Sequence, residues 1–174
     1  MGQHLRRHFE QLGYRVTSLG RTAAGPGQVH WDGRTLGPWA AELEGADILL
    51  NLAGRSVDCR YTEANRHDII ASRVESTRVL GAAVAACQQP PRVWLNSSTS
   101  TIYADTQGTQ PANTEAEGVI GEGFSVAVAQ AWEAAFADCA APRTRKVALR
   151  TAIVLGNDGG AFPMLVRLAK LGLC

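Results

Sequence analysis

A nearly continuous apolar run at residues 46–54, closed by a glycine, constrains the fold of this chain more than any other feature. Such runs are typical of central strands in a parallel sheet that is covered on both faces. Comparable strand-like runs follow at 92–95 and 145–156, and the segments between them have helical spacing of apolar residues. Strands that alternate with helices predict a doubly wound, parallel, Rossmann-like α/β fold.

The other elements follow from the same periodicities. The sequence predicts helices at 2–12, 38–43, 62–87, 124–140 and 162–171, strands at 15–19 and 29–31, and loops at 105–122 and 159–160. In a doubly wound nucleotide fold, the pyrophosphate-binding turn joins a first strand to the first helix. Because this chain opens with the helix, we expect an incomplete dinucleotide-binding domain over 1–174 that lacks the first strand.

Composition narrows the classes of partner. The chain has 17 basic and 16 acidic residues and a net charge of +1, with no basic run, so nucleic acid is a poor candidate for a partner. No apolar run reaches the ~18 residues that a bilayer span needs, so we expect no membrane partner. The four cysteines form no Cys-x-x-Cys pair, which fits a reducing, cytoplasmic location. His4 and His8 share a helix face without a third ligand, so we expect no metal site.

Several motifs, in order and spacing, resemble those of the extended short-chain dehydrogenase/reductases, which include sugar-nucleotide epimerases and dehydratases. They are Asn51-Leu52-Ala53-Gly54, Ser72–Thr77, Ser97–Asp105 and Leu149–Gly156. The Trp132-Glu133 pair is typical of a poorly characterised epimerase-like subgroup. The resemblance covers essentially the whole chain. It implies a nicotinamide dinucleotide cofactor, an unknown small-molecule substrate and a C-terminal substrate domain, which would follow Cys174 and which we expect this chain to lack.

The resemblance also implies how the family carries out its chemistry. A Ser or Thr at the end of the fifth strand binds substrate oxygen, and a Tyr with a Lys one helical turn later transfers the proton. Thr99 takes the hydroxyl position. Counting from Glu133, which we interpret as a salt-bridging helix residue, the Tyr and Lys positions hold Ser125 and Ala129. Neither can perform the family's proton transfer.

Tyr103 is the remaining candidate for a catalytic acid. No lysine follows it at helical spacing, because position 107 is a glutamine, Gln107. In the family this tyrosine usually supports the structure or lines the substrate site. The proton donor therefore stays open.

Arg21, which follows the expected strand at 15–19, bears on the choice of cofactor. An acidic residue there would bind the ribose 2′-hydroxyl, whereas an arginine can pair with a 2′-phosphate, so NADP is favoured over NAD. Asp32 is a weaker candidate for contact with the adenine and more typical of a surface turn. Arg73 could face the cofactor or an anionic substrate, or pack its stem on the sheet. The complete set of expected cofactor contacts is Gly2, Arg21, Asn51, Leu52, Ala53, Gly54, Arg73, Ser97, Ser98 and Thr151.

Three hypotheses remain open at this point. The chain could be an epimerase- or reductase-like enzyme in which the cofactor supplies the hydride and Thr99 polarises the substrate. It could bind the dinucleotide without turnover, as a sensor or scaffold. It could also be an inactive fragment that binds the cofactor poorly, because the glycine turn before Gly2 is missing.

Overall fold

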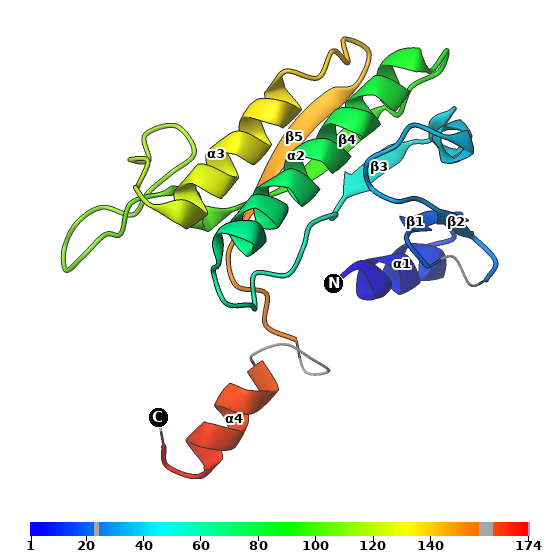
Figure 1. The fold of residues 1–174 in the computed structure, drawn as a ribbon. Helices are drawn as coiled ribbons and strands as arrows, with labels where there is room; N and C mark the ends of the chain where they lie inside the picture. Colours follow the sequence, from blue (N-terminus) through cyan, green and yellow to red (C-terminus); the bar gives the residue numbers. More distant parts are fainter. Residues whose placement is uncertain (23–24, 157–161, 174) are drawn as a thin grey trace.

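The computed structural model describes residues 1–22, 25–156 and 162–173 (Figure 1). The α-helices are α1 (Gly2–Gln11), α2 (Glu63–Ala86), α3 (Phe124–Ala137) and α4 (Phe162–Lys170). The 3-10 helices are η1 (Pro38–Leu43) and η2 (Ser100–Ile102). The strands are β1 (Ser18–Gly20), β2 (Gln28–His30), β3 (Ile48–Asn51), β4 (Val93–Thr99) and β5 (Arg145–Thr151).

All strand pairs are parallel, as the alternating pattern predicted, which gives the chain a Rossmann-like α/β fold. The strands form two sheets, β1-β2 and β3-β4-β5. In the larger sheet Leu50, Leu95 and Val147 lie in register across the three strands. Within the described residues β1 and β3 are each paired on one side only, so each is an edge strand.

Two predicted strands differ in extent from the observed ones. The first lies at 18–20 rather than 15–19, because it pairs only with the three residues of β2. The last ends at Thr151 rather than at 156, because Thr151 is the last residue in register with β4. The predicted helix at 38–43 is present as the 3-10 helix η1.

The core lies on one face of the larger sheet. Helices α2 and α3 lie side by side across that face (Figure 1). Trp94 on β4 is fully buried there, and its ring packs edge-on against Phe136 of α3 with 4.8 Å between ring centroids. Truncating a buried aromatic side chain to alanine typically costs about 3–5 kcal/mol, so this contact is a principal tie between helix and sheet.

The opposite face of the same sheet is less covered. Side chains alternate along β4, so Trp94, Asn96 and Ser98 are buried while Leu95 and its neighbours on the other face are only half-buried. Ile48 on β3 is 42% exposed. Within the described residues this face of the run 46–54 is therefore only partly covered, because α2 and α3 both pack on the other face.

The smaller sheet joins the core through η1. Trp39 of η1 is buried against Trp31, which follows β2, with 5.3 Å between the ring centroids. Both rings belong to the same apolar cluster as Leu49, Leu80 and Trp94. By contrast, α1 and α4 bury no residue, and α4 lies apart from the other elements (Figure 1).

Candidate functional site

The polar strand ends expected to form a site gather at one edge of the larger sheet. Because the strands are parallel, the ends of β3, β4 and β5 at Asn51, Thr99 and Thr151 meet at their carboxyl edge. Ligands bind at this edge in open α/β sheets. The side chains there fall into a buried set under the helices and an open set beyond the strand ends.

We call Asn51, Thr77, Asn96 and Trp132 the buried polar cluster. Asn51 Nδ2 donates to Asn96 Oδ1 at 2.7 Å and to Thr77 Oγ1 at 3.3 Å. Trp132 Nε1 donates to Thr77 Oγ1 at 3.0 Å, so one hydroxyl of α2 binds both β3 and α3. Polar groups without solvent are stable only when hydrogen-bonded, and these satisfy one another. The cluster fixes how the two helices sit on the sheet.

The buried polar cluster limits which atoms at the end of β3 are available to contact a cofactor. The Asn51 side chain is buried, and its Oδ1 also accepts from the backbone N–H of Ala53 at 3.0 Å. Its amide is therefore fully engaged within the protein. Any contact of this strand end with a cofactor falls to the backbone and to the half-buried Leu52 and Ala53.

Arg73 takes the packed arrangement rather than an open one. Its Nη1 donates to the carbonyls of Ile69 at 2.9 Å and Arg55 at 3.1 Å, and its guanidinium lies over the Trp132 ring. Burial lowers the pKa of Arg73. A Cβ on Gly54 would lie only 3.2 Å from the guanidinium carbon. The glycine thus makes room for Arg73, which is a structural reason for it beside the expected cofactor approach.

The start of α1 lies beside the end of β3. A Cβ on Gly2 would come within 3.7 Å of Leu52 Cδ1, so the structure brings together two of the predicted cofactor residues. Arg21 follows β1 directly and is exposed. In the described part of the chain its only hydrogen bond is through its carbonyl, which lies 3.1 Å from His30 Nδ1. Its guanidinium therefore has no protein partner there.

Asp32 adopts the surface-turn role. Its Oδ1 accepts from the backbone N–H groups of Arg34 and Thr35, each at 2.8 Å. These bonds lower the pKa of Asp32 to about 2. The carboxylate stabilises its own turn.

A second cluster joins α3 to β5. Glu133 accepts from Arg150 Nε at 2.9 Å and Nη2 at 2.7 Å, and from the Ser98 hydroxyl. Arg150 and Ser98 hold the pKa of Glu133 below its usual range, and Glu133 with Tyr103 raises that of Arg150. The interpretation of Glu133 as a salt-bridging residue is confirmed.

Arg150 was not singled out from the sequence. The available signal was a lone charge in the first half of the largely apolar run 147–156. Its Nη1 also donates to the phenol oxygen of Tyr103 at 2.6 Å, which places that oxygen against β5. A Cβ on Gly118 would come within 2.3 Å of the Tyr103 ring, so the 113–121 loop lies directly over it.

The hydroxyls of the open set have fewer partners. Thr99 Oγ1 lies 3.0 Å from Thr101 Oγ1 and accepts from the backbone N–H of Thr101 at 3.2 Å. Thr151 Oγ1 donates weakly to the carbonyls of Leu149 at 3.2 Å and Ser98 at 3.4 Å. Ser97, half-buried on the open face, makes no side-chain hydrogen bond within the described chain.

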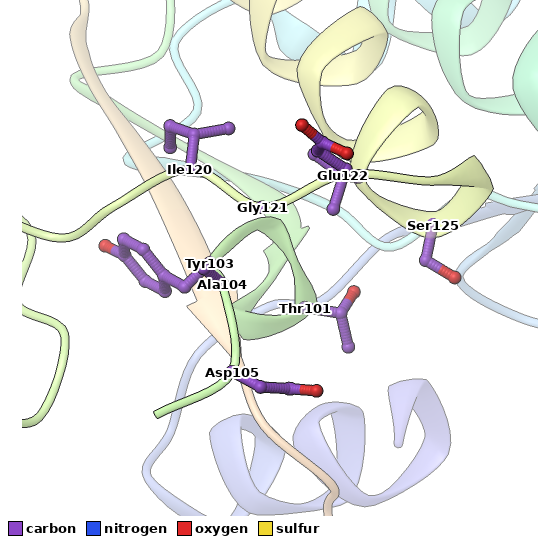
Figure 2. Close-up of a pocket in the computed structure, with 9 residues that line it drawn as sticks. Thr101, Tyr103, Ala104, Asp105, Ile120, Gly121, Glu122 and Ser125 are labelled. Carbon is purple, nitrogen blue, oxygen red and sulfur yellow. The ribbon is translucent and has the colours of Figure 1, made fainter. Parts of the chain in front are cut away.

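An opening of about 450 Å³ lies between η2 and the start of α3 (Figure 2). Its lining residues are Thr101, Tyr103, Ala104, Asp105, Ile120, Gly121, Glu122, Ser125 and Val126. We call it the η2–α3 opening. Ser125, at the expected tyrosine position, is exposed in it, whereas Ala129, at the expected lysine position, is fully buried.

Neither lysine of the chain replaces the missing one. Lys146 Nζ donates to the carbonyls of Phe136 at 3.0 Å and of Ala137 and Cys139 at 2.8 Å, where it caps the end of α3. Cations stabilise helix C-termini in this way. Lys170 lies on α4, away from the sheet edge (Figure 1).

Parallel strand ends, a helix start beside one of them and an exposed arginine after β1 are typical of a dinucleotide-binding α/β domain. Residues 1–168 match the model of the NAD dependent epimerase/dehydratase family. The chain belongs to this family, as the motifs predicted. Within its described residues, no helix has both the length and the apolar character to cross a membrane.

Individual relatives agree with this assignment. The chain is 32% identical to the human epimerase family protein SDR39U1 over 99% of its own length and 57% of the relative's. It is 29% identical to YfhF, an epimerase family protein of Bacillus subtilis, over 95% and 55% of the two chains. The crystal structure of human SDR39U1 with NADPH superposes with a TM-score of 0.80 at 30% identity, over 99% and 57%. The chain thus spans little more than half of these relatives.

Proposed function

We propose that residues 1–174 form a dinucleotide-binding domain of an epimerase- or reductase-like enzyme that uses NADPH, with NADH as a weaker alternative. The observation that carries the proposal is the similarity to a human relative crystallised with NADPH. Arg21 supports the choice of NADP, because its guanidinium is exposed and unpaired in the described chain.

The proposed cofactor contacts run along the carboxyl edge. Gly2 and Leu52 lie together near the expected pyrophosphate, and Arg21 would pair with the 2′-phosphate. Ala53, Gly54, Ser97, Ser98 and Thr151 would border the rest of the cofactor, with Asn51 and Arg73 holding the edge in shape. When bound, the nicotinamide supplies hydride chemistry. Thr99 would orient a substrate oxygen, and Tyr103 remains a candidate proton donor.

A second candidate function is cofactor binding without turnover. The observation that favours it is that the expected lysine position holds Ala129, which is fully buried and has no charge to support proton transfer. We also propose a cytoplasmic location, no nucleic-acid partner and a small-molecule substrate of unknown identity, on the grounds of scattered thiols and balanced charge.

The binding proposal is tested by titrating NADPH and NADH into the 174-residue chain and following nicotinamide fluorescence. We expect saturable binding with a preference for NADPH. Arg21→Ser should lower that preference about tenfold or more, the value of a charge-assisted contact to phosphate. Arg15→Ser removes an exposed arginine before β1 and should leave the preference unchanged. Absence of saturable binding would contradict the proposal and favour an inactive fragment.

Turnover distinguishes the two candidate functions. A change in nicotinamide absorbance with a panel of carbonyl compounds would support an enzyme. Thr99→Val should then lower turnover while leaving NADPH affinity unchanged, because Thr99 is assigned to the substrate and not to the cofactor. Saturable NADPH binding without any absorbance change would favour the binding protein.

A further inference from the structure

Among the described residues, Asp105 is the one aspartate that borders the η2–α3 opening. It is exposed, and within the described part of the chain its carboxylate has no hydrogen bond or ion pair. Figure 2 shows the side chains of Asp105, Thr101 and Ser125 bordering the same space, with the Thr101 hydroxyl turned away from the Asp105 carboxylate. Glu122 also borders the opening, but its carboxylate turns away from that space (Figure 2).

The space in front of Asp105 is connected to the expected reaction site. Thr101 borders the opening and lies within hydrogen-bonding distance of Thr99, with 3.0 Å between the two hydroxyl oxygens. A small ligand held by Asp105 and Thr101 would therefore lie close to the hydroxyl proposed to orient the reacting oxygen. This connection relates Asp105 to the substrate rather than to a remote surface.

In the part of the chain that the structure describes, no cationic side chain borders the opening. The nearby Arg150 is engaged by Glu133 and Tyr103. The start of α3, where Gly123 provides no side-chain cap, adds the partial positive charge of a helix N-terminus. That charge is about half an elementary charge, so the full charge of Asp105 exceeds it.

A carboxylate only accepts hydrogen bonds, whereas hydroxyls both donate and accept. A ligand facing Asp105 must therefore bring donors, either hydroxyl or ammonium groups. A carboxylate or phosphate in the same place would carry the same charge as Asp105. Like charges a few ångströms apart repel each other even in a solvated site.

We propose that Asp105 is a specificity-determining residue, which selects carbonyl substrates bearing hydroxyl or ammonium groups next to the reacting carbon and disfavours anionic ones. This inference rests on the proposed function, because it assumes that the opening receives the substrate. It goes further by assigning a charge preference and the residue responsible for it.

The test uses three probes that share one sugar ring and differ in charge: D-glucosamine, D-glucose and D-glucuronate. Dissociation constants are measured by ligand-observed NMR on the 174-residue chain, with and without NADPH. We expect glucosamine to bind most tightly and glucuronate most weakly. Asp105→Asn should lower the glucosamine-to-glucuronate affinity ratio about 25-fold, because one charge at short range in water changes the affinity of each charged probe about fivefold in opposite directions.

Asp138→Asn is the matched control, because it removes the same charge at the opposite end of α3 and should leave the ratio unchanged. The inference is overturned if glucuronate binds as tightly as glucosamine, if both variants shift the ratio equally, or if no probe binds. Failure of the proposed function is separate, because it would show as loss of NADPH binding in the fluorescence titration while the probe ratio could still depend on Asp105.

Discussion

The buried polar cluster and the open hydroxyls contain similar residues at the same sheet edge, yet they have opposite roles. Thr77 and Asn96 are 0% and 1% exposed and bind only one another and their neighbours. Thr101 and Ser125, a short distance away in the fold, are exposed and border an opening. The difference lies in the cover: side chains beneath α2 and α3 build the fold, and those beyond the strand ends remain available to a ligand.

We expect the largest loss of stability when a charged side chain is placed in the buried region beneath the helices. Ala129→Lys puts a long cation at a position with 0% exposure in α3. Overpacking and loss of hydration both oppose it, so we expect a loss of about 4 kcal/mol or more in the free energy of unfolding. Urea denaturation followed by circular dichroism measures this.

Ser125→Tyr is the counterpart in the open set. It adds the family's expected phenol at an exposed position bordering a 450 Å³ opening, so we expect a change within about 1 kcal/mol. A tolerated lysine at position 129 would show that the α2–α3 contact is looser than the structure indicates. Equal losses in both variants would remove the contrast between the two sets.

A threonine-to-valine substitution made once in each set tests the comparison with a smaller expected change in stability. Thr77→Val leaves Trp132 Nε1 without its acceptor and takes a partner from Asn51. A buried donor left unsatisfied costs about 1–3 kcal/mol, so we expect a loss of about 2–3 kcal/mol. Thr101→Val alters an exposed hydroxyl and should change stability by about 0.5 kcal/mol or less. Equal midpoints in urea would contradict the distinction.

The order of elements and the parallel sheet could be predicted, because apolar periodicity depends on local sequence. Which face each strand presents to which helix could not, because it depends on where distant helices pack. For that reason the burial of the Asn51 side chain in the polar cluster could not be foreseen from the sequence. Arg73 matched one of its two expected arrangements. The Glu133 ion pair could be expected from its residue type, whereas its partner Arg150 is 17 residues away on another element.

The Glu133–Arg150 pair lies between the two sets, since its side chains are 19% and 24% exposed. We expect Arg150→Met to cost about 1–2 kcal/mol, less than a fully buried pair because solvent screens it. The folded-state pKa of Glu133 is depressed below its ordinary value of 4.5. The contribution of Glu133 to the free energy of unfolding is therefore present above pH 4.5 and is lost as the pH falls through the folded-state pKa.

Unfolding free energies of the native chain and Glu133→Gln, measured in urea at pH 7, 5 and 3, check that dependence. The gap between the two should be constant from pH 7 to 5 and should narrow toward pH 3. Arg150→Met should show a similar narrowing, because it removes the main cause of the depressed pKa. A gap that does not change with pH would mean that the pair contributes packing alone, which would place it with the buried polar cluster rather than between the two sets.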